Sequence, residues 1–194
     1  MRLVDRAKNI LLTPKTEWAA ISAETTSIKD LYLGYAVILA AIRPIASIIG
    51  FGVFGLHVPF SDVVYRWPLD TAIEYAVVAY ALSLCGVFVF ALIIDGLAPT
   101  FGGQKNQLQA LKVSIYASTA SWLAGIFGII PALGILGLVG LYSLYLLYVG
   151  LPVLMKSPQD KAMGYTVVTI ICAIVLYFVL GIIAGTVISV PRYM

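Results

Sequence analysis

The sequence has few charged residues. Asp, Glu, Lys and Arg make up 11% of its 194 residues, whereas about a quarter is usual in soluble globular domains. Hydrophobic residues make up 61%, and the mean hydropathy is +1.01. This composition excludes a soluble globular domain. The formal net charge of +3 comes from scattered basic residues, which excludes nucleic acid as a partner.

Residue types that carry catalytic or metal chemistry are also scarce. The two cysteines, Cys85 and Cys172, lie within apolar stretches without a CxxC spacing, so we expect both to be small core residues. The single histidine, His57, has no nearby cysteine or second histidine and is expected to be a solvated loop residue. HExxH, P-loop and GxSxG motifs are absent. The sequence therefore predicts no catalytic residue, no metal site, no cofactor and no enzyme.

Long apolar stretches dominate the chain instead. A helix needs about 20 apolar residues to cross a bilayer core about 30 Å thick, and five stretches reach that length. A single span over 108–154 would be roughly twice too long at 1.5 Å per residue, so Pro131 is the expected break. The predicted fold is all-α, a polytopic membrane protein with a five-helix transmembrane bundle in residues 31–194. The predicted spans are residues 31–55, 71–94, 108–130, 132–154 and 163–190.

Basic residues concentrate on one side of the predicted spans. With the N-terminus in the cytoplasm, nine of the twelve Lys and Arg are inside, and only Arg66 and Arg192 are outside. Short cytoplasmic segments carry such an excess of Lys and Arg. The sequence therefore predicts a cytoplasmic N-terminus and a C-terminus outside.

Residues 1–30 form a cytoplasmic segment with short amphipathic helices. Residues 3–12 place apolar side chains on one face, and Thr13-Pro14 starts a second helix with Trp18 and Ile21. Nine charges, four of them acidic, are unlike a cleavable signal peptide. Two arrangements stay open. The helices lie on the inner leaflet with Trp18 at headgroup depth, or they pack on the cytoplasmic ends of the bundle.

Small residues recur along one face of the third predicted span. This stripe favours a close helix contact over a polar substrate path, because small residues let helix backbones approach in lipid. A GxxxG pattern in the fifth predicted span indicates close packing in the same way. The expected packing residues are Ser114, Ser118, Ser121, Gly125, Gly128, Gly181 and Gly185.

Two charged residues lie inside the apolar spans at overlapping depths. Arg43 is in the first span and Glu74 in the second. A lone charge at the bilayer centre costs at least about 2.5 kcal/mol on insertion scales, so we expect the two to form an ion pair. The pair is either structural or the mark of a polar cavity.

A second group of charges is expected at the cytoplasmic side. Asp95 ends the second span and Lys112 lies one turn into the third. They either form an ion pair or reach to water separately. We expect Asp95, Lys105 and Lys112 to line one polar patch facing the N-terminal helices and Glu17, and this patch is the candidate partner surface.

Three segments resemble the bacterial branch of the Yip-domain family of Ypt/Rab-interacting membrane proteins. They are residues 13–21 (TPKTEWAAI), residues 95–103 (DGLAPTFGG), and residues 152–156 (PVLMK) with Pro158. The resemblance implies five spans, a cytoplasmic N-terminus and, in a bacterium, an inner-membrane location. For eukaryotic members it implies a role in Golgi and secretory membranes through Rab GTPases and through association of members.

The resulting hypothesis is a non-enzymatic membrane protein of Yip type that organises membrane components or binds partners. The lipid bilayer is the expected partner, together with other membrane proteins or further copies of the chain. The alternative is a transporter or channel for a small solute or ion, with a polar cavity near Arg43 and Glu74.

Overall fold

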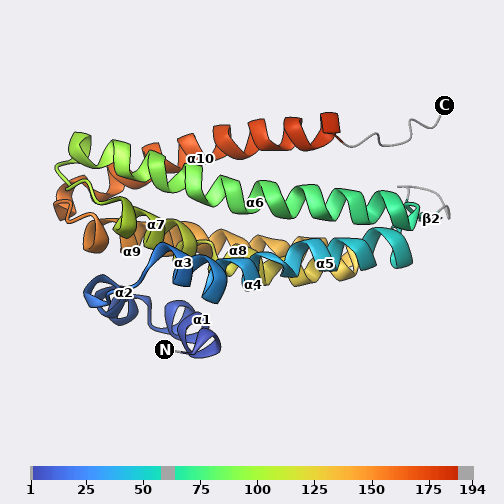
Figure 1. Ribbon diagram of the computed structural model, residues 1–194, viewed down its shortest axis with the longest axis horizontal. Helices are drawn as coiled ribbons and strands as arrows, with labels where there is room; N and C mark the ends of the chain where they lie inside the picture. The colour runs from blue at the N-terminus through green and yellow to red at the C-terminus, as the bar shows by residue number, and fades with distance from the viewer. Residues whose placement is uncertain (1, 58–63, 188–194) are drawn as a thin grey trace.

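The computed structural model describes residues 2–57 and 64–187. Within these residues the chain is mostly helical, with one short hairpin and short connections between the helices (Figure 1). Two N-terminal helices, α1 (Leu3–Leu12) and α2 (Pro14–Ala23), lie beside a bundle of long helices. The protein is therefore an all-α polytopic membrane protein.

The first long helical segment is built from short pieces. These are α3 (Ile28–Leu31), the π-helical turn η1 (Tyr32–Ala36), α4 (Val37–Ala40), α5 (Ile42–Ile49) and a second π-helical turn, η2 (Gly50–Phe54). Extra residues in π-helical turns change which side chains face the neighbouring helices. The direction in which each side chain of this segment points therefore cannot be obtained by counting 3.6 residues per turn along its whole length.

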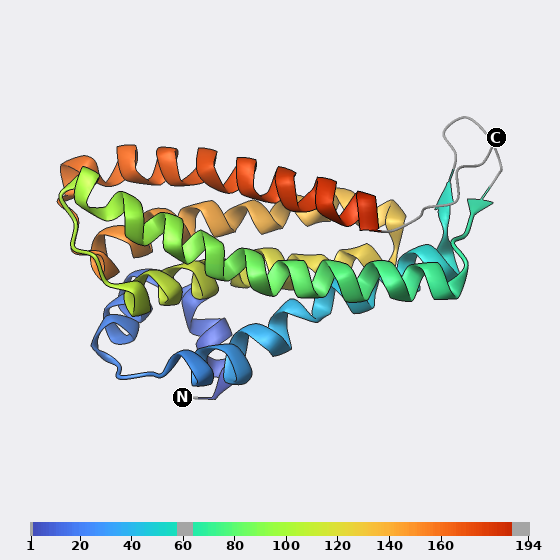
Figure 2. The ribbon, with the colours of Figure 1, turned by 45° about the horizontal axis from the view of Figure 1, so that its top comes forward.

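A hairpin joins this segment to the longest helices. Strands β1 (Leu56–His57) and β2 (Val64–Tyr65) pair antiparallel, with Leu56 opposite Tyr65. Helix α6 (Leu69–Leu97) then returns along the bundle and ends in the 3-10 turn η3 (Ala98–Phe101). Figure 2 shows the hairpin at one end of the bundle and α2 at the other, and we call these the hairpin end and the α2 end.

The third predicted span forms α7 (Gln107–Ala117), α8 (Thr119–Ala124) and the 3-10 helix η4 (Gly125–Ile129). Asn106 caps α7 because its side chain accepts a hydrogen bond from the Gln109 N–H at 3.1 Å. The chain turns back at Ile130-Pro131, where the sequence predicts a break.

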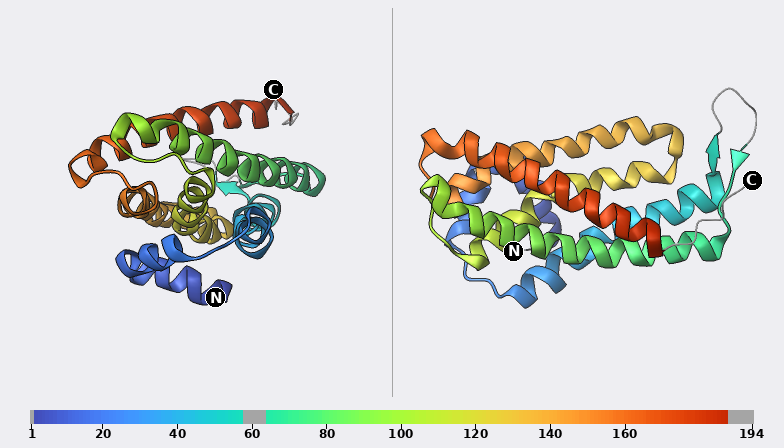
Figure 3. Two further views of the ribbon diagram at one scale, coloured as in Figure 1. Left: turned by 60° about the vertical axis from the view of Figure 1, so that its left-hand side comes forward. Right: turned by 90° about the horizontal axis from the view of Figure 1, so that it is seen from above.

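The returning chain forms the last helices. The 3-10 helix η5 (Pro131–Leu141) leads into α9 (Tyr142–Leu154), and α10 (Gln159–Val187) follows after a short turn at the α2 end. Helices α6 and α10 pack along one another, as the views in Figure 3 also show.

Four helical segments are long and apolar enough to cross a membrane. They are Ile28–Phe54, Leu69–Phe101, Pro131–Leu154 and Gln159–Thr186. The segment from α7 to η4 is not one of these four, so the count of five spans stays a prediction.

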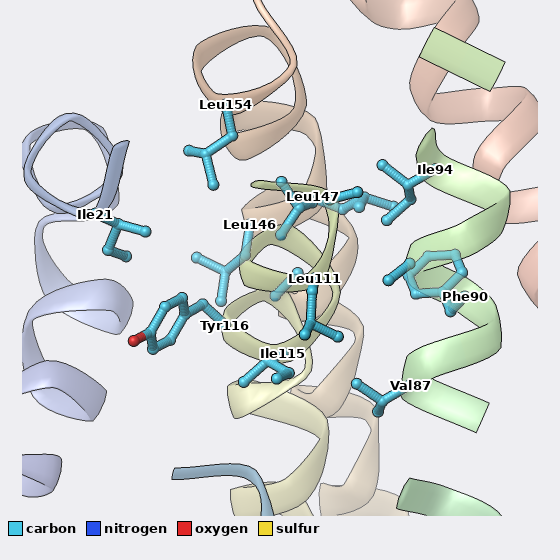
Figure 4. Packing of buried hydrophobic residues seen from close by; sticks show 14 of the residues in the cluster. Ile21, Val87, Phe90, Ile94, Leu111, Ile115, Tyr116, Leu146, Leu147 and Leu154 are labelled. Carbon is cyan, nitrogen blue, oxygen red and sulfur yellow. The ribbon is translucent and has the colours of Figure 1, made fainter. Parts of the chain in front are cut away.

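Helix α7 forms the centre of the core at the α2 end. Residues 110–117 are all buried, including the polar Lys112 and Ser114. Figure 4 shows Leu111 and Ile115 between residues of α6 and residues of α9. Because protein surrounds α7, its polar side chains can bond to neighbouring helices and do not face lipid. This accounts for its lower hydropathy.

Candidate functional site

The N-terminal helices pack against the bundle. Ile10 of α1 and Trp18 and Ile21 of α2 are fully buried. Trp18 lies on Gly150 of α9, so closely that a Cβ added at Gly150 would come within 2.7 Å of the indole ring. The N-terminal helices therefore pack on the bundle, and the depth of Trp18 relative to a bilayer stays a prediction.

A buried group of charged side chains joins α1 to α2. The Arg6 guanidinium donates to the Glu17 carboxylate at 2.5 Å and also to the Glu24 carboxylate. Arg6 is 4% exposed and Glu17 6%. Burial opposes the charge of Arg6, but the hydrogen bond and charges of the two carboxylates outweigh it and raise the pKa of the guanidinium above its ordinary value. Arg6 is therefore a permanent cation in this site.

Lys112 connects the end of α2 to α7. Its Nζ donates to the carbonyl oxygens of Ile21 at 2.9 Å and of Glu24 at 2.6 Å, and the residue is 1% exposed. A cation at the C-terminal end of a helix satisfies carbonyl groups that lack partners within the helix. Lys112 thus fixes α2 on the core.

Aromatic side chains extend this group into the bundle. The Arg6 Cζ lies 5.6 Å from the centroid of the Tyr116 ring, and Tyr116 packs edge-on against Tyr35 at 4.8 Å between centroids. The Tyr35 hydroxyl hydrogen bonds with the Thr119 hydroxyl at 2.8 Å. We call Arg6, Glu17, Glu24 and Lys112 the buried charge cluster, and the tyrosines link it to η1 and α8.

A groove lies beside the buried charge cluster. Two hollows of about 530 and 240 Å³ adjoin, because both are lined by Ser22, Asn106 and Gln109. The larger one runs along the connection between α2 and α3 and is also lined by Lys112. The smaller one includes Lys105 and Lys156. We call the two hollows together the polar groove.

A family model, the Yip1 domain, matches residues 8–183, which is almost the whole chain. The chain belongs to the Yip1-domain family. Comparison with curated proteins and with solved structures gives no match. The Yip1-domain match includes Glu17, Glu24 and Lys112 of the buried charge cluster and begins two residues after Arg6.

Two of the three segments that carry the resemblance to Yip1-domain proteins, residues 95–103 and residues 152–156 with Pro158, contact each other. Gly102 has a φ of +71°, and a Cβ there would come within 3.2 Å of Pro158. A Cβ at Gly103 would come within 2.8 Å of the Met155 carbonyl oxygen, which accepts from the Gln104 N–H at 2.8 Å. The two glycines therefore let the turn after α6 approach the end of α9.

Neither alternative for Asp95 and Lys112, which both lie within the described residues, is correct: they form no ion pair, and Lys112 is buried and does not reach water. The Asp95 carboxylate accepts from the Asn106 N–H at 2.7 Å, and Lys112 bonds to the end of α2. Asp95 thus closes the turn before α7 and does not line the polar groove. Lys105 and Lys112 do line the groove, while Glu17 faces Arg6.

The predicted pair of Arg43 and Glu74 is also wrong. Across residues 2–57 and 64–187, the ion pairs are those that Arg6 forms with Glu17 and Glu24. Arg43 and Glu74 are both exposed on the bundle surface. The helical rise gives the two residues overlapping depths. An ion pair also requires side chains that face each other, and the rotation of α5 and α6 about their axes leaves both side chains on the exposed surface.

The small residues of the third predicted span lie at several helix contacts. Ser114 donates to the Val87 carbonyl of α6 at 2.7 Å. Ser121 bonds to the Gly140 carbonyl of η5 at 3.1 Å, whereas Ser118 bonds within its own helix to the Ser114 carbonyl at 2.7 Å. A Cβ at Gly125 would clash with Arg43 of α5. Different positions of the stripe thus meet different helices.

The three remaining glycines differ in their surroundings. A Cβ at Gly128 would lie 3.9 Å from Ala46, but a Cβ at Gly50 of η2 would come within 2.1 Å of the Gly128 carbonyl oxygen, so the two backbones lie close together there. A Cβ at Gly181 or Gly185 would meet nothing within 4 Å in the described residues.

The two cysteines lie at the surface of the bundle. Cys85 is exposed and Cys172 is partly exposed, which corrects the expectation that both are core residues.

Sequence reasoning missed Arg6 and Glu24 as site residues. A signal for Arg6 was present, because it lies four residues before Ile10 on the apolar face of α1. Glu17 likewise precedes Ile21 by four residues on the apolar face of α2. A charged side chain needs a partner when it is buried, and Arg6 and Glu17 have opposite charges. An ion pair between α1 and α2 could therefore have been predicted from the sequence.

Proposed function

We propose that the chain is a non-enzymatic membrane scaffold that binds partner proteins at its α2 end. The observation that carries this proposal is the buried charge cluster. It fixes α1 and α2 on the bundle through side chains and carbonyl groups from three helices. A fixed pair of short helices outside the apolar spans presents a surface of constant shape, which lowers the ordering cost of partner binding.

The proposal also includes an orientation. The α2 end, with α1 and α2, faces the cytoplasm of a bacterial cell, because nine of the twelve basic residues lie on that side when five spans are counted. Reporter fusions at the two chain ends test this orientation. Both ends on the same side would contradict it.

Site-specific photo-crosslinking tests partner binding. A photoreactive residue at the exposed positions Lys15 or Ala20 of α2 should give discrete protein adducts. The same residue at Phe178, on the exposed apolar side of α10, is the control for random collision in the membrane. Adducts should disappear in Arg6→Ala, which releases α1 from α2, and persist in Arg43→Ala.

Liposome experiments separate the scaffold from a transporter. Purified protein in liposomes should pass no more small solute or ion than protein-free liposomes do. Flux above that background, or adducts from α2 that match those from Phe178, would contradict the scaffold function.

A further inference from the structure

The cationic side chains of the polar groove indicate what it binds. Lys105, Lys112 and Lys156 line it, and its one lining carboxylate, Glu24, is held by Arg6. An ammonium group has three N–H donors, and Lys112 uses two of them on carbonyl oxygens. The groove therefore presents unused donors and positive charge to a ligand, which is the chemistry that phosphate binds.

Gln109 adds a requirement for a donor on the ligand. Its Nε2 donates to the Ser22 carbonyl at 3.2 Å, whereas its Oε1 is buried without a hydrogen bond partner. A buried acceptor without a partner is unfavourable, and a ligand hydroxyl would satisfy it once the Gln109 side chain turns into the groove that it lines. The hydroxyl would then lie next to the phosphate.

The groove also adjoins the first segment that is long and apolar enough to cross a membrane. The first membrane-crossing segment starts at Ile28, directly after the groove-lining Ser27. Ile28 is 46% exposed and Leu33 is 58% exposed, so apolar side chains continue from the groove along the outside of this segment. Basic pockets at the ends of membrane helices bind anionic lipid headgroups.

We propose that the polar groove binds the headgroup of an anionic phospholipid that carries hydroxyl groups, as phosphatidylglycerol does. The lysines contact the phosphate, and the Gln109 side chain turns into the groove so that its Oε1 accepts from a headgroup hydroxyl. The acyl chains lie along the exposed apolar side of the segment that begins at Ile28. This site goes beyond the scaffold function and does not depend on any protein partner.

Lys156 provides a sharp test. Its φ of 53° is in the left-handed region, where glycine is the most favourable residue. Lys156→Gly therefore removes a groove ammonium while the backbone conformation becomes easier to adopt. If Lys156 had only a structural role, its substitution would not lower the ligand affinity while the stability of the protein stayed unchanged.

The experiment titrates the full chain in non-ionic detergent with dioctanoyl phosphatidylglycerol and follows the thermal unfolding midpoint. A ligand that binds the folded state raises this midpoint. We expect a saturable rise with phosphatidylglycerol and none with dioctanoyl phosphatidylcholine. Lys156→Gly and Lys105→Gln should each weaken the apparent affinity at least fivefold. The unliganded midpoint of Lys156→Gly should be unchanged or higher.

Matched controls separate a site from general charge attraction. Lys8 and Lys15 are exposed lysines away from the groove, and Lys8→Gln and Lys15→Gln should keep the affinity within twofold. Gln109→Leu should lower the preference for phosphatidylglycerol over phosphatidic acid, whose headgroup lacks hydroxyl groups on a second glycerol. Equal losses in groove and control variants would overturn the proposal. Soluble glycerol phosphate binding as tightly as the lipid would overturn the lipid as occupant.

Discussion

The two ends of the bundle differ in the surroundings of their charged side chains. At the α2 end, Arg6 and Lys112 are buried and each makes more than one hydrogen bond. Towards the hairpin end, Arg43 and Glu74 are exposed and do not pair. A charge stabilises a fold only where the surrounding groups satisfy it. The α2 end is therefore where substitutions of charged residues should unfold or loosen the protein.

The largest expected effect is from Arg6→Ala. The change leaves the buried Glu17 and the partly buried Glu24 without their shared cation, and removing one partner of a buried pair costs about 3–5 kcal/mol. We expect this loss in the free energy of unfolding in detergent, with faster proteolysis within α1. Arg43→Ala is the control and should change stability by less than about 1 kcal/mol, because an exposed arginine without an ion pair is removed. Equal losses would remove the contrast between the two ends.

The next effect is from Lys112→Met. The substitution keeps the apolar stem but leaves the Ile21 and Glu24 carbonyl groups without their donor, and hydrogen bonds to charged groups are worth about 1.5–3 kcal/mol. Chemical unfolding should report a loss in this range. Lys105→Met at an exposed position is the matched control and should be near neutral. A neutral Lys112→Met would mean that the ammonium does not hold α2.

A somewhat smaller effect is expected from Gly150→Ala. The added methyl group would lie 2.7 Å from the Trp18 ring, and overpacking of this kind costs about 1–3 kcal/mol. Trp18 fluorescence and the unfolding midpoint should both change. Gly181→Ala on α10 meets nothing within 4 Å among the described residues and should be neutral or slightly stabilising. Loss of stability in Gly181→Ala instead would reveal a contact with another molecule.

The smallest effect is expected from Ser114→Ala. It removes the 2.7 Å hydrogen bond from α7 to the Val87 carbonyl, and such bonds between membrane helices average about 0.6 kcal/mol. Ser118→Ala is the comparison, because Ser118 bonds to its own helix and joins no second one. Unfolding in mixed micelles should separate the two variants. The same loss in both would indicate that the bond between helices adds nothing.

Much of the fold could be predicted because it depends on local sequence. Length and composition alone indicate helices that cross a membrane, and Pro131 breaks the chain where the structure turns. The Yip resemblance was visible in residues 95–103, and the match over residues 8–183 supports it. Residues 108–130 are not among the four segments that are long and apolar enough to cross a membrane, because a helix surrounded by protein need not be apolar throughout.

Which charges meet was decided only by the tertiary structure. Depth along a helix follows from counting residues, and it placed Arg43 and Glu74 at similar heights. The direction of a side chain around the helix axis depends on how helices rotate and pack, and the π-helical turns of the first segment shift that rotation. As a result, Glu17 pairs with Arg6, and the Asp95 carboxylate accepts a hydrogen bond from the Asn106 N–H. The sequence by itself determined which segments are helical and apolar, while packing selected the partner of each buried polar group.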